Sequence, residues 1–377
     1  MKILFVSMPS VHVTRWIENL KDADHELHWF DVLDRGKLET LSSVHQFTDW
    51  KKRKLPYIKG EYFLKKKIPL LYEKIVPNLE VSVEEAFEKI ILEIQPDVVH
   101  SFELHYCSFP ILKVMKKYIH IKWVYFCWGN DIFRHQVLKS DLEKISSVLK
   151  RTNFLITDCK RDFFLAEKYG FKGQFLGVLP GGAGYDLAHI KSSYKELHPR
   201  KIILIKGYQN EIGRALFVLK AIKTIIKDLE KFEIYVFSAR GEVSNFILSD
   251  FELSKKVKIL GQLNQLELFH YFGKSFLYIG NNISDGMPNT LIEALLLGAY
   301  PLQSNPGNAT LELIGNKYFG MTIDNPENPE EIANKIMQII GQKESLVSLA
   351  SLNHENALED YNYDKIKEKI CNLYNSL

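Results

Sequence analysis

Two carboxylates flank a short polar loop in the segment LYIGNNISDGMPNTLIEALLLG, residues 277–298. Asp285 lies in the loop, and Glu293 follows eight positions later in an apolar run. The residues before the loop predict a buried strand, and those after it predict a helix that begins near Pro288 and ends near Gly298. A strand–loop–helix unit leaves backbone N–H groups and the positive end of a helix dipole facing the loop. The segment therefore predicts a binding site for an anion such as a diphosphate.

Each carboxylate also has an ordinary structural explanation. Glu293 near the start of a helix can act on the helix dipole alone, which contributes about 0.3–1 kcal/mol. Asp285 stands beside a glycine and can be a simple turn residue. For each residue taken singly, both interpretations stay open.

Length and composition indicate the class of protein. The 377 residues exceed what one hydrophobic core usually spans, so we expect two domains. A content of 46% hydrophobic and 25% charged residues is typical of globular proteins. The four cysteines form no C-x-x-C pair, which favours free thiols in a reducing compartment. No apolar run reaches membrane-spanning length, and the N-terminus predicts a strand and not a signal peptide, so we expect a cytoplasmic protein.

The opening of the chain, residues 2–32, predicts a strand, a helix and a second strand. This order is the start of a doubly wound sheet. No G-x-G-x-x-G follows the first strand, which argues against a dinucleotide in this half. Ser10 and His12 lie in the loop at the carboxyl end of that strand, where open α/β sheets bind ligands. A single loop histidine is also compatible with no role in binding.

The spacing of the two carboxylates, D-G-x-P-x-x-x-x-E-A-x-x-x-G, resembles the acidic-x7-acidic signature of GT-B glycosyltransferases, and of the retaining family 4 in particular. That family usually has glutamate at the first position, where this chain has Asp285, and Glu293 keeps the second. The resemblance implies two Rossmann-like, doubly wound α/β domains that face a cleft. It also implies transfer of a hexosyl unit from a nucleoside-diphosphate sugar to a hydroxyl acceptor with retention of configuration.

In the first half of the chain, the resemblance extends over residues 96–131. The passages PDVVHSFELH and CWGND are similar to the family's PD-x-V-H-x-H and G-S-D motifs. They imply an acceptor side made of Ser10, His12, Glu103, His105, Gly129 and Asp131. Asp131 has an alternative role as the cap of the helix that follows.

In the second half, the family's G-R-x5-K phosphate clamp is altered, since Gly207 is followed by Tyr208. We expect the nearby Lys206 and Arg214 to bind the diphosphate, because a leaving diphosphate develops negative charge. Their alternative role is as surface or helix charges. The resemblance implies a donor site made of Lys206, Gly207, Arg214, Gln262, Gly286, Met287, Pro288, Asn289 and Glu293, and catalytic roles for Asp285, Glu293, Arg214 and Asp131.

Within this donor site, the resemblance places Glu293 on the ribose, Asp285 on the donor sugar and Gln262 near the nucleobase. No metal and no other cofactor is expected, because cations and a helix end supply the positive charge. The only D-x-D, at residues 22–24, precedes a predicted strand and fits a surface turn.

Residues 51–74 carry nine basic and two acidic side chains, a local charge of +7 in a chain whose net charge is +3. Aromatic and aliphatic residues are interleaved with these charges. Such a segment suits an anionic membrane surface, and nucleic acid is a second candidate partner. A solvated basic face on ordinary helices is the third interpretation. No nucleic-acid motif accompanies the segment, so we expect no nucleic acid.

We therefore predict a GT-B protein with an acceptor-binding domain at residues 1–190, a nucleotide-sugar domain at 191–352 and a final helix at 353–377 that packs on the first domain. The expected acceptor is a glycan or a lipid-linked glycan in bacterial surface polysaccharide synthesis. The protein is expected in the cytoplasm, free or peripheral on the inner face of the membrane. A nucleotide-sugar 2-epimerase and a non-catalytic scaffold or binding subunit are the alternatives.

Overall fold

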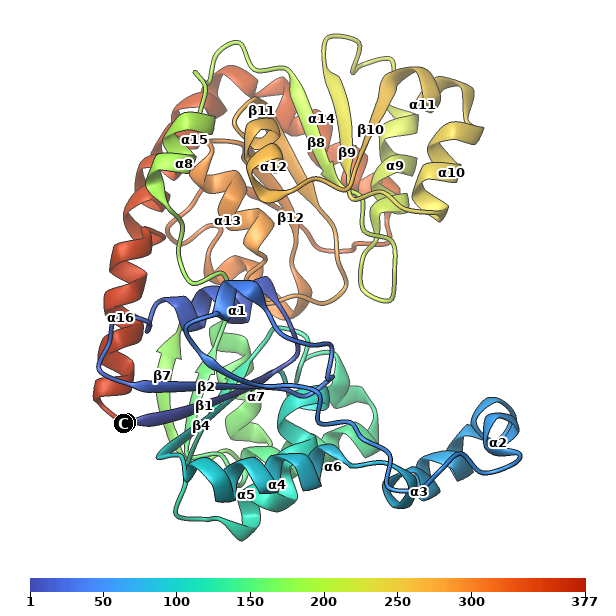
Figure 1. Ribbon diagram of the computed structural model, residues 1–377. Helices are drawn as coiled ribbons and strands as arrows, with labels where there is room; N and C mark the ends of the chain where they lie inside the picture. Colours follow the sequence, from blue (N-terminus) through green and yellow to red (C-terminus); the bar gives the residue numbers. More distant parts are fainter. The chain divides into compact units, whose positions relative to one another are not determined.

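The computed structural model describes all 377 residues and divides into two compact units (Figure 1). The first unit contains Met1–Thr157, Phe163–Leu179 and Leu377, and the second contains Asp158–Asp162 and Pro180–Ser376. Each unit has its own parallel sheet, as predicted for two Rossmann-like domains. None of the helices combines the length and the apolar character that crossing a membrane requires.

The sheet of the first unit has seven parallel strands in the order β3-β2-β1-β4-β5-β6-β7. The strands are β1 (Lys2–Ser7), β2 (Glu26–Asp31), β3 (His45–Phe47), β4 (Val98–Phe102), β5 (Lys122–Cys127), β6 (Phe154–Thr157) and β7 (Gln174–Val178). The strand order reverses between β1 and β4, so the loops that follow these neighbouring strands diverge. Open α/β sheets form their ligand crevices at such a point, outside the carboxyl ends of the strands.

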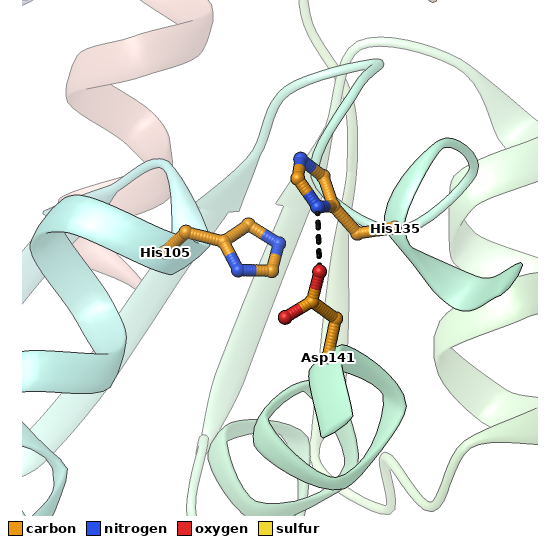
Figure 2. A group of neighbouring side chains, drawn as sticks. All are labelled: His105, His135 and Asp141. Carbon is orange, nitrogen blue, oxygen red and sulfur yellow. Dashed lines mark hydrogen bonds and ion pairs between the residues drawn. The ribbon is translucent and has the colours of Figure 1, made fainter. Parts of the chain in front are cut away.

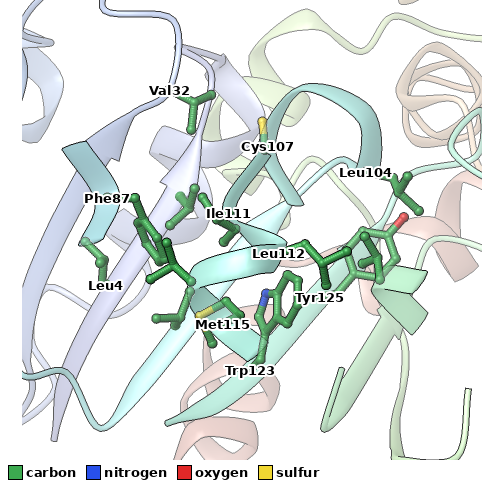
Figure 3. Packing of buried hydrophobic residues seen from close by; sticks show 14 of the residues in the cluster. Leu4, Val32, Phe87, Leu104, Cys107, Ile111, Leu112, Met115, Trp123 and Tyr125 are labelled. Carbon is green, nitrogen blue, oxygen red and sulfur yellow. The ribbon is translucent and has the colours of Figure 1, made fainter. Parts of the chain in front are cut away.

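The first unit has seven helices. They are α1 (Val11–Glu18), α2 (Glu61–Lys67), α3 (Pro69–Leu79), α4 (Val83–Ile94), α5 (Phe109–Lys117), α6 (Lys139–Leu149) and α7 (Lys160–Lys168), with short turns η1 (Glu39–Leu41), η2 (Leu104–Ser108) and η3 (His135–Val137). Helix α4 begins with a capping box, in which Ser82 and Glu85 exchange hydrogen bonds. Figure 3 shows Phe87 of α4, Met115 of α5 and Trp123 of β5 in the buried cluster beneath the sheet.

The second unit has six parallel strands in the order β10-β9-β8-β11-β12-β13. The strands are β8 (Ile202–Lys206), β9 (Glu233–Phe237), β10 (Val257–Gly261), β11 (Ser275–Gly280), β12 (Tyr300–Ser304) and β13 (Met321–Ile323). Here the order reverses between β8 and β11, and β11 is the strand predicted to precede the Asp285 loop. Ile203 and Ile205 pack into one apolar cluster and Leu204 into another, because successive strand residues face opposite sides of the sheet.

The helices of the second unit are α8 (Leu187–Ser193), α9 (Ala215–Thr224), α10 (Glu242–Ser249), α11 (Phe251–Lys256), α12 (Gln265–Phe272), α13 (Asn289–Leu296), α14 (Pro329–Gly341), α15 (Lys343–Asp360) and α16 (Tyr363–Asn375). The predicted domain limit at residue 353 lies inside α15. The domain limits and the packing of the final helix on the first domain stay predictions.

The segment after β12 forms two short 3-10 turns, η4 (Pro306–Asn308) and η5 (Thr310–Glu312). Gly307 adopts the left-handed region with φ of 59°, which interrupts a helix after Pro306.

The carboxyl end of α13 is closed by side chains from distant parts of the unit. Arg200 is 5% exposed, and its Nη1 donates to the carbonyl oxygens of Leu297 at 2.9 Å and Ser275 at 3.1 Å. Nδ1 of His354 lies 2.5 Å from the carbonyl oxygen of Leu296. Burial lowers the pKa of Arg200 to about 10, and the side chain stays a cation at neutral pH. A cation at this position also complements the negative end of the helix dipole.

We expect Arg200→Met to lower the free energy of unfolding by about 2–4 kcal/mol, because two buried carbonyl groups lose their donor. Urea unfolding of the full chain measures this change. Lys201→Met, at the exposed neighbouring position, is the control and should change it by no more than about 0.5 kcal/mol. Equal losses in the two variants would contradict the role given to Arg200.

Candidate active site

The predicted donor residues gather at the carboxyl edge of the second sheet. Lys206 ends β8, Gly280 ends β11, and these two strands are neighbours at the reversal of strand order. Gly207 follows directly, and its N–H donates to the carbonyl oxygen of Phe237 at 2.8 Å. A Cβ atom at position 207 would lie 2.7 Å from that same oxygen, so the close approach of β8 and β9 requires glycine.

The Asp285 loop is held by its own polar groups. Asn282 Nδ2 donates to Oδ2 of Asp285 at 2.8 Å, and the N–H of Gly286 donates to Oδ1 at 3.1 Å. The N–H of Asn282 donates to Ser304 Oγ at 2.7 Å, which ties the loop to the end of β12. A Cβ atom at Gly286 would lie 2.2 Å from Oδ1 of Asp158, so the loop also needs glycine there. These bonds agree with the turn role of Asp285 and also fix where its carboxylate lies.

Helix α13 begins directly after this loop, as predicted. Pro288 is its N-cap residue, and no side chain caps its first turn. Met287 and Asn289 flank Pro288, so residues 286–289, which are expected to bind a diphosphate, lead directly into the helix. A Cβ atom at Gly182 would lie 2.9 Å from Asn289 Oδ1, so the chain at Gly182 passes close to the start of the helix. The N-terminal end of α13 therefore lies at the carboxyl edge of the sheet, with the positive end of its dipole there.

Glu293 is buried one turn into α13, with 5% of its surface exposed. Its Oε1 accepts a hydrogen bond from Nε2 of Gln265 at 2.9 Å. Gln265 begins α12, and sequence reasoning did not single it out, because a glutamine at a helix start carries no distinctive signal. A carboxylate has about four lone-pair positions for hydrogen-bond donors, which suits it to the recognition of a polar ligand.

The predicted phosphate-binding cations have other partners in this structure. Arg214 Nε lies 2.6 Å from Oε1 of Glu327, although the N–H of Arg214 donates to Asn281 beside the loop. Lys206 Nζ lies 4.8 Å from the ring centroid of Tyr208. The backbone of Arg214 is therefore at the loop, and its guanidinium group is engaged at Glu327.

Gln262 lies at the end of β10, two strands away from β8. Its Oε1 accepts from Nη2 of Arg240 at 2.8 Å. Sequence reasoning passed over Arg240, because it follows β9 without a motif around it.

Arg161 is a further residue that sequence reasoning missed. Its Nη1 donates to the carbonyl oxygens of Asp285 at 2.8 Å and Pro306 at 2.7 Å. Its Nε lies 2.9 Å from Oδ1 of Asp162. Burial lowers the pKa of Arg161, but the carboxylate of Asp162 outweighs this effect and the pKa is raised. The guanidinium group therefore fixes the backbone of the Asp285 loop as a permanent cation.

The acceptor-side residues lie at the carboxyl edge of the first sheet. Ser10 caps α1, since its Oγ accepts from the N–H of His12 at 3.2 Å, and the His12 ring meets the Trp128 ring edge-on with centroids 6.1 Å apart. Glu103 has φ of 64°, and its carboxylate accepts from the N–H groups of His105 at 2.8 Å and Tyr106 at 2.6 Å. Burial raises the pKa of Glu103 despite these hydrogen bonds. Its carboxylate thus holds the start of η2.

Asp131 follows Gly129 in the loop after β5 and is 3% exposed. Its Oδ2 accepts from Tyr125 Oη at 2.7 Å and from the N–H of Trp128 at 3.0 Å. Burial raises the pKa of Tyr125 well above its usual range, so the phenol remains a donor. Asp131 therefore bonds back to Trp128, three residues earlier in its own loop, where the alternative interpretation expected it to cap the following helix.

Comparison with known proteins follows the division of the chain into two sheets. Residues 2–158 match a family model described as "Glycosyl transferase 4-like", and residues 192–355 match one described as "Glycosyl transferases group 1". Comparison with curated protein sequences finds no significant match.

Several solved structures share the fold over the whole length of the chain. A sucrose-phosphate synthase from Thermosynechococcus elongatus has a TM-score of 0.73 at 15% identity, with 100% of this chain and 98% of that chain covered. Anabaena HepE in complex with UDP-glucose has a TM-score of 0.69 at 13% identity, with 100% of both chains covered. A glycosyltransferase from Rickettsia africae has a TM-score of 0.67 at 15% identity, covering 100% of this chain and 97% of that one.

The two parallel sheets and these neighbours define the class as the GT-B fold, which confirms the predicted architecture. The two family models, which together span most of the chain, identify the activity class as well. The protein belongs to the GT-B glycosyltransferases. Its first half matches the glycosyl transferase 4-like family, and its second half matches glycosyl transferases group 1.

We expect Asp131→Ala to lower the free energy of unfolding by about 2–4 kcal/mol, because Tyr125 Oη and the N–H of Trp128 lose a buried acceptor. Tyr125→Phe, which removes only one of the two bonds, should cost less. Thermal and urea unfolding of both variants measure the difference. An Asp131→Ala variant with wild-type stability would show that the carboxylate is not needed to hold its loop.

Proposed function

We propose that this glycosyltransferase moves a hexosyl unit from a nucleoside-diphosphate sugar to a hydroxyl group of a glycan or lipid-linked acceptor, with retention of configuration. The observation that carries the proposal is the arrangement around α13. A buried carboxylate, Glu293, lies one turn above a helix N-terminus, which in turn follows the Asp285 loop at the reversal of strand order. The neighbouring HepE structures contain UDP and UDP-glucose, which supports a nucleotide sugar as donor.

The positions of the groups suggest how each would act on such a donor. The amides of residues 286–289 and the α13 dipole would stabilise the charge of the diphosphate. Glu293 would accept hydrogen bonds from the ribose hydroxyls. Asp285 would bind hydroxyls of the sugar and stabilise the positive charge that develops at its anomeric carbon.

The reaction itself is a substitution at that carbon. The bond to the phosphate oxygen breaks with its electron pair leaving on the diphosphate. A bond to the acceptor oxygen forms, and the proton of the acceptor hydroxyl passes to the released diphosphate or to solvent.

Arg214 can bind the diphosphate if its guanidinium group leaves Glu327. Its ion pair with Glu327 is exposed on the glutamate side, where 52% of the side chain is accessible, so the pair contributes at most about 1 kcal/mol. A diphosphate with more than one negative charge at the end of β11 would compete well for the same guanidinium group. In this proposal no metal is needed, since cations and the helix end supply the positive charge.

A non-catalytic binding subunit is the second candidate, and one observation favours it. Both predicted cations are engaged elsewhere, and Asp285 replaces the usual glutamate while bonding within its own turn. Such a protein would bind a nucleotide sugar without releasing the diphosphate. A 2-epimerase would instead return an isomerised nucleotide sugar.

Thermal shift with UDP, GDP, ADP, CMP and their common sugars, each with and without EDTA, tests the donor. A ligand at 100 times its Kd stabilises the protein by about 2.7 kcal/mol, which gives a measurable shift. We expect one diphosphate to raise the melting temperature equally in the presence of EDTA. No shift with any nucleotide would contradict the proposed donor site, and binding without release of diphosphate to any acceptor would favour the non-catalytic subunit.

With the nucleotide so identified, Glu293→Ala should weaken its binding by about 10- to 100-fold and leave the far-UV circular dichroism unchanged, because a buried polar partner of the ligand is lost. Isothermal titration measures the affinity. Glu330→Ala, an exposed glutamate of the same unit, is the matched control. Unchanged affinity in Glu293→Ala would remove Glu293 from the donor site.

The basic segment 51–74 supplies the proposed contact with an anionic membrane. Its helices α2 and α3 extend away from the sheet of the first unit (Figure 1). Exposed apolar side chains line them, with Tyr62 and Leu70 each 76% exposed. The combination of uncovered apolar side chains and excess positive charge is complementary to anionic lipid headgroups and to the apolar layer below them.

Two of the basic residues have structural tasks and do not belong to this contact. Arg53 Nη1 lies 2.7 Å from Oε1 of Glu61, and hydrogen bonding from Arg53 lowers the pKa of Glu61 to about 2. Tyr72 Oη donates to the same carboxylate at 3.0 Å. Lys54 is paired with Glu85 at 2.5 Å. Lys65, Lys66 and Lys67 at the end of α2 carry the charge available to a membrane.

Replacing Lys65, Lys66 and Lys67 by Ser should lower binding to phosphatidylserine-containing vesicles by about 10- to 100-fold, since each basic residue near the surface contributes about 1 kcal/mol. Vesicle sedimentation measures this binding. Replacing Lys220, Lys227 and Lys231 of the second unit by Ser removes the same charge and should have little effect. Equal losses from the two triple variants would show a general charge effect and no docking through α2.

A further inference from the structure

Three side chains of types that bind metal ions converge in the first unit, outside the proposed donor site. His105 comes from η2 after β4, His135 from η3, and Asp141 from the first turn of α6 (Figure 2). One ligand atom of each lies within 4.8 Å of the other two. The two imidazole rings have centroids 3.9 Å apart, and His135 Nδ1 lies 3.1 Å from Asp141 Oδ2. The three residues are half-buried, so the cluster is open to solvent.

The hydrogen bonds around His105 and Asp141 are compatible with a metal ligand set. Nε2 of His105 lies 3.2 Å from the carbonyl oxygen of Asp131, which can only accept, so a neutral His105 carries its proton on Nε2. Its Nδ1 then holds a lone pair. Asp141 Oδ2 accepts from His135 Nδ1 at 3.1 Å, and its Oδ1 accepts from Lys144 Nζ at 3.0 Å, so the carboxylate is held beside the two imidazole rings.

The contact of His105 with Asp131 is an independent sign of a ligand role. Metal-binding histidines nearly always donate their second ring N–H to a carbonyl or carboxylate, which fixes the orientation of the ring. Here the acceptor carbonyl belongs to the loop that Tyr125 and Trp128 hold in place through the Asp131 carboxylate. His105 is therefore oriented by a rigid part of the fold, and His135 and Asp141 lie opposite its ring.

We propose that His105, His135 and Asp141 bind one Zn²⁺ or a similar divalent transition metal ion, with a water in the fourth position. Two imidazoles and one carboxylate form a common ligand set for zinc, with metal–ligand distances of about 2.0–2.2 Å. Small rotations of the side chains would bring the three ligand atoms to these distances. The site goes beyond the proposed glycosyl transfer, whose donor chemistry lies in the second unit and uses no metal.

Lys144 distinguishes a metal site from an ordinary surface network. Its Nζ lies 3.0 Å from Asp141 Oδ1, so it holds the carboxylate when no cation is bound. A metal ion at Oδ2 has to bind against this neighbouring positive charge. Removing the charge should therefore strengthen metal binding, whereas a simple network of hydrogen bonds would gain no metal affinity from it.

The test uses the full chain after treatment with EDTA and dialysis. Equilibrium dialysis against ZnCl2 gives stoichiometry and affinity, and the visible absorption of Co²⁺ reports imidazole and carboxylate coordination. We expect one ion per chain. Asp141→Asn and His135→Ala should each weaken binding by at least about 100-fold, and Lys144→Met should tighten it by about 10-fold. His120→Ala, an exposed histidine of the same unit, is the matched control and should change nothing.

Two outcomes would overturn the proposal, and neither depends on a single variant. Zinc retained equally by the wild type, Asp141→Asn and His135→Ala would place the ion elsewhere and overturn the proposal. Lack of any zinc or cobalt uptake by both the wild type and Lys144→Met would overturn it as well. Because the readout is metal content and not activity, the outcome is independent of whether the proposed transfer reaction is confirmed.

Discussion

The candidate donor site depends on how the unpaired backbone groups at the two ends of α13 are hydrogen-bonded. Every α-helix leaves backbone N–H groups at one end and carbonyl groups at the other without partners inside the helix. The carboxyl end of α13 is closed in the interior by Arg200 and His354, which donate to its last carbonyl groups. The amino end begins at Pro288 without a side-chain cap and lies at the sheet edge. The helix is thus anchored at one end and presents its positive dipole at the other.

The same division between structural and chemical tasks applies to the carboxylates of the first unit. Glu103 and Asp131 lie in passages that resemble family motifs of the acceptor side, and both accept hydrogen bonds from backbone N–H groups of their own loops. Loops at the edge of a parallel sheet have many backbone groups without strand partners, and short acidic side chains satisfy them. His105, which these two residues position, is half-buried and remains in contact with solvent.

The basic residues fall into two groups, those bonded within the fold and those accessible to a ligand. Arg161 and Arg200 are buried and bonded to carbonyl groups, so they fix the backbone. Arg214 has a partner that is half exposed and easily exchanged. In the basic segment, Arg53 pairs with the buried Glu61 at the start of α2, whereas the lysines at the end of α2 are exposed. Burial and the kind of partner thus separate cations that stabilise the fold from those that can meet an anionic ligand.

The sequence by itself determined the α/β class, the Asp285 loop and α13, because apolar periodicity and the positions of proline and glycine fix such features over a few residues. The two doubly wound sheets were implied by the resemblance to GT-B enzymes. Only the tertiary structure decided the partners of the named side chains. The pairing of Gln265 with Glu293, the contact of Arg161 with the Asp285 backbone and the cluster of His105, His135 and Asp141 join residues from separate elements. Such contacts depend on strand order and loop direction, which no short-range pattern in the chain encodes.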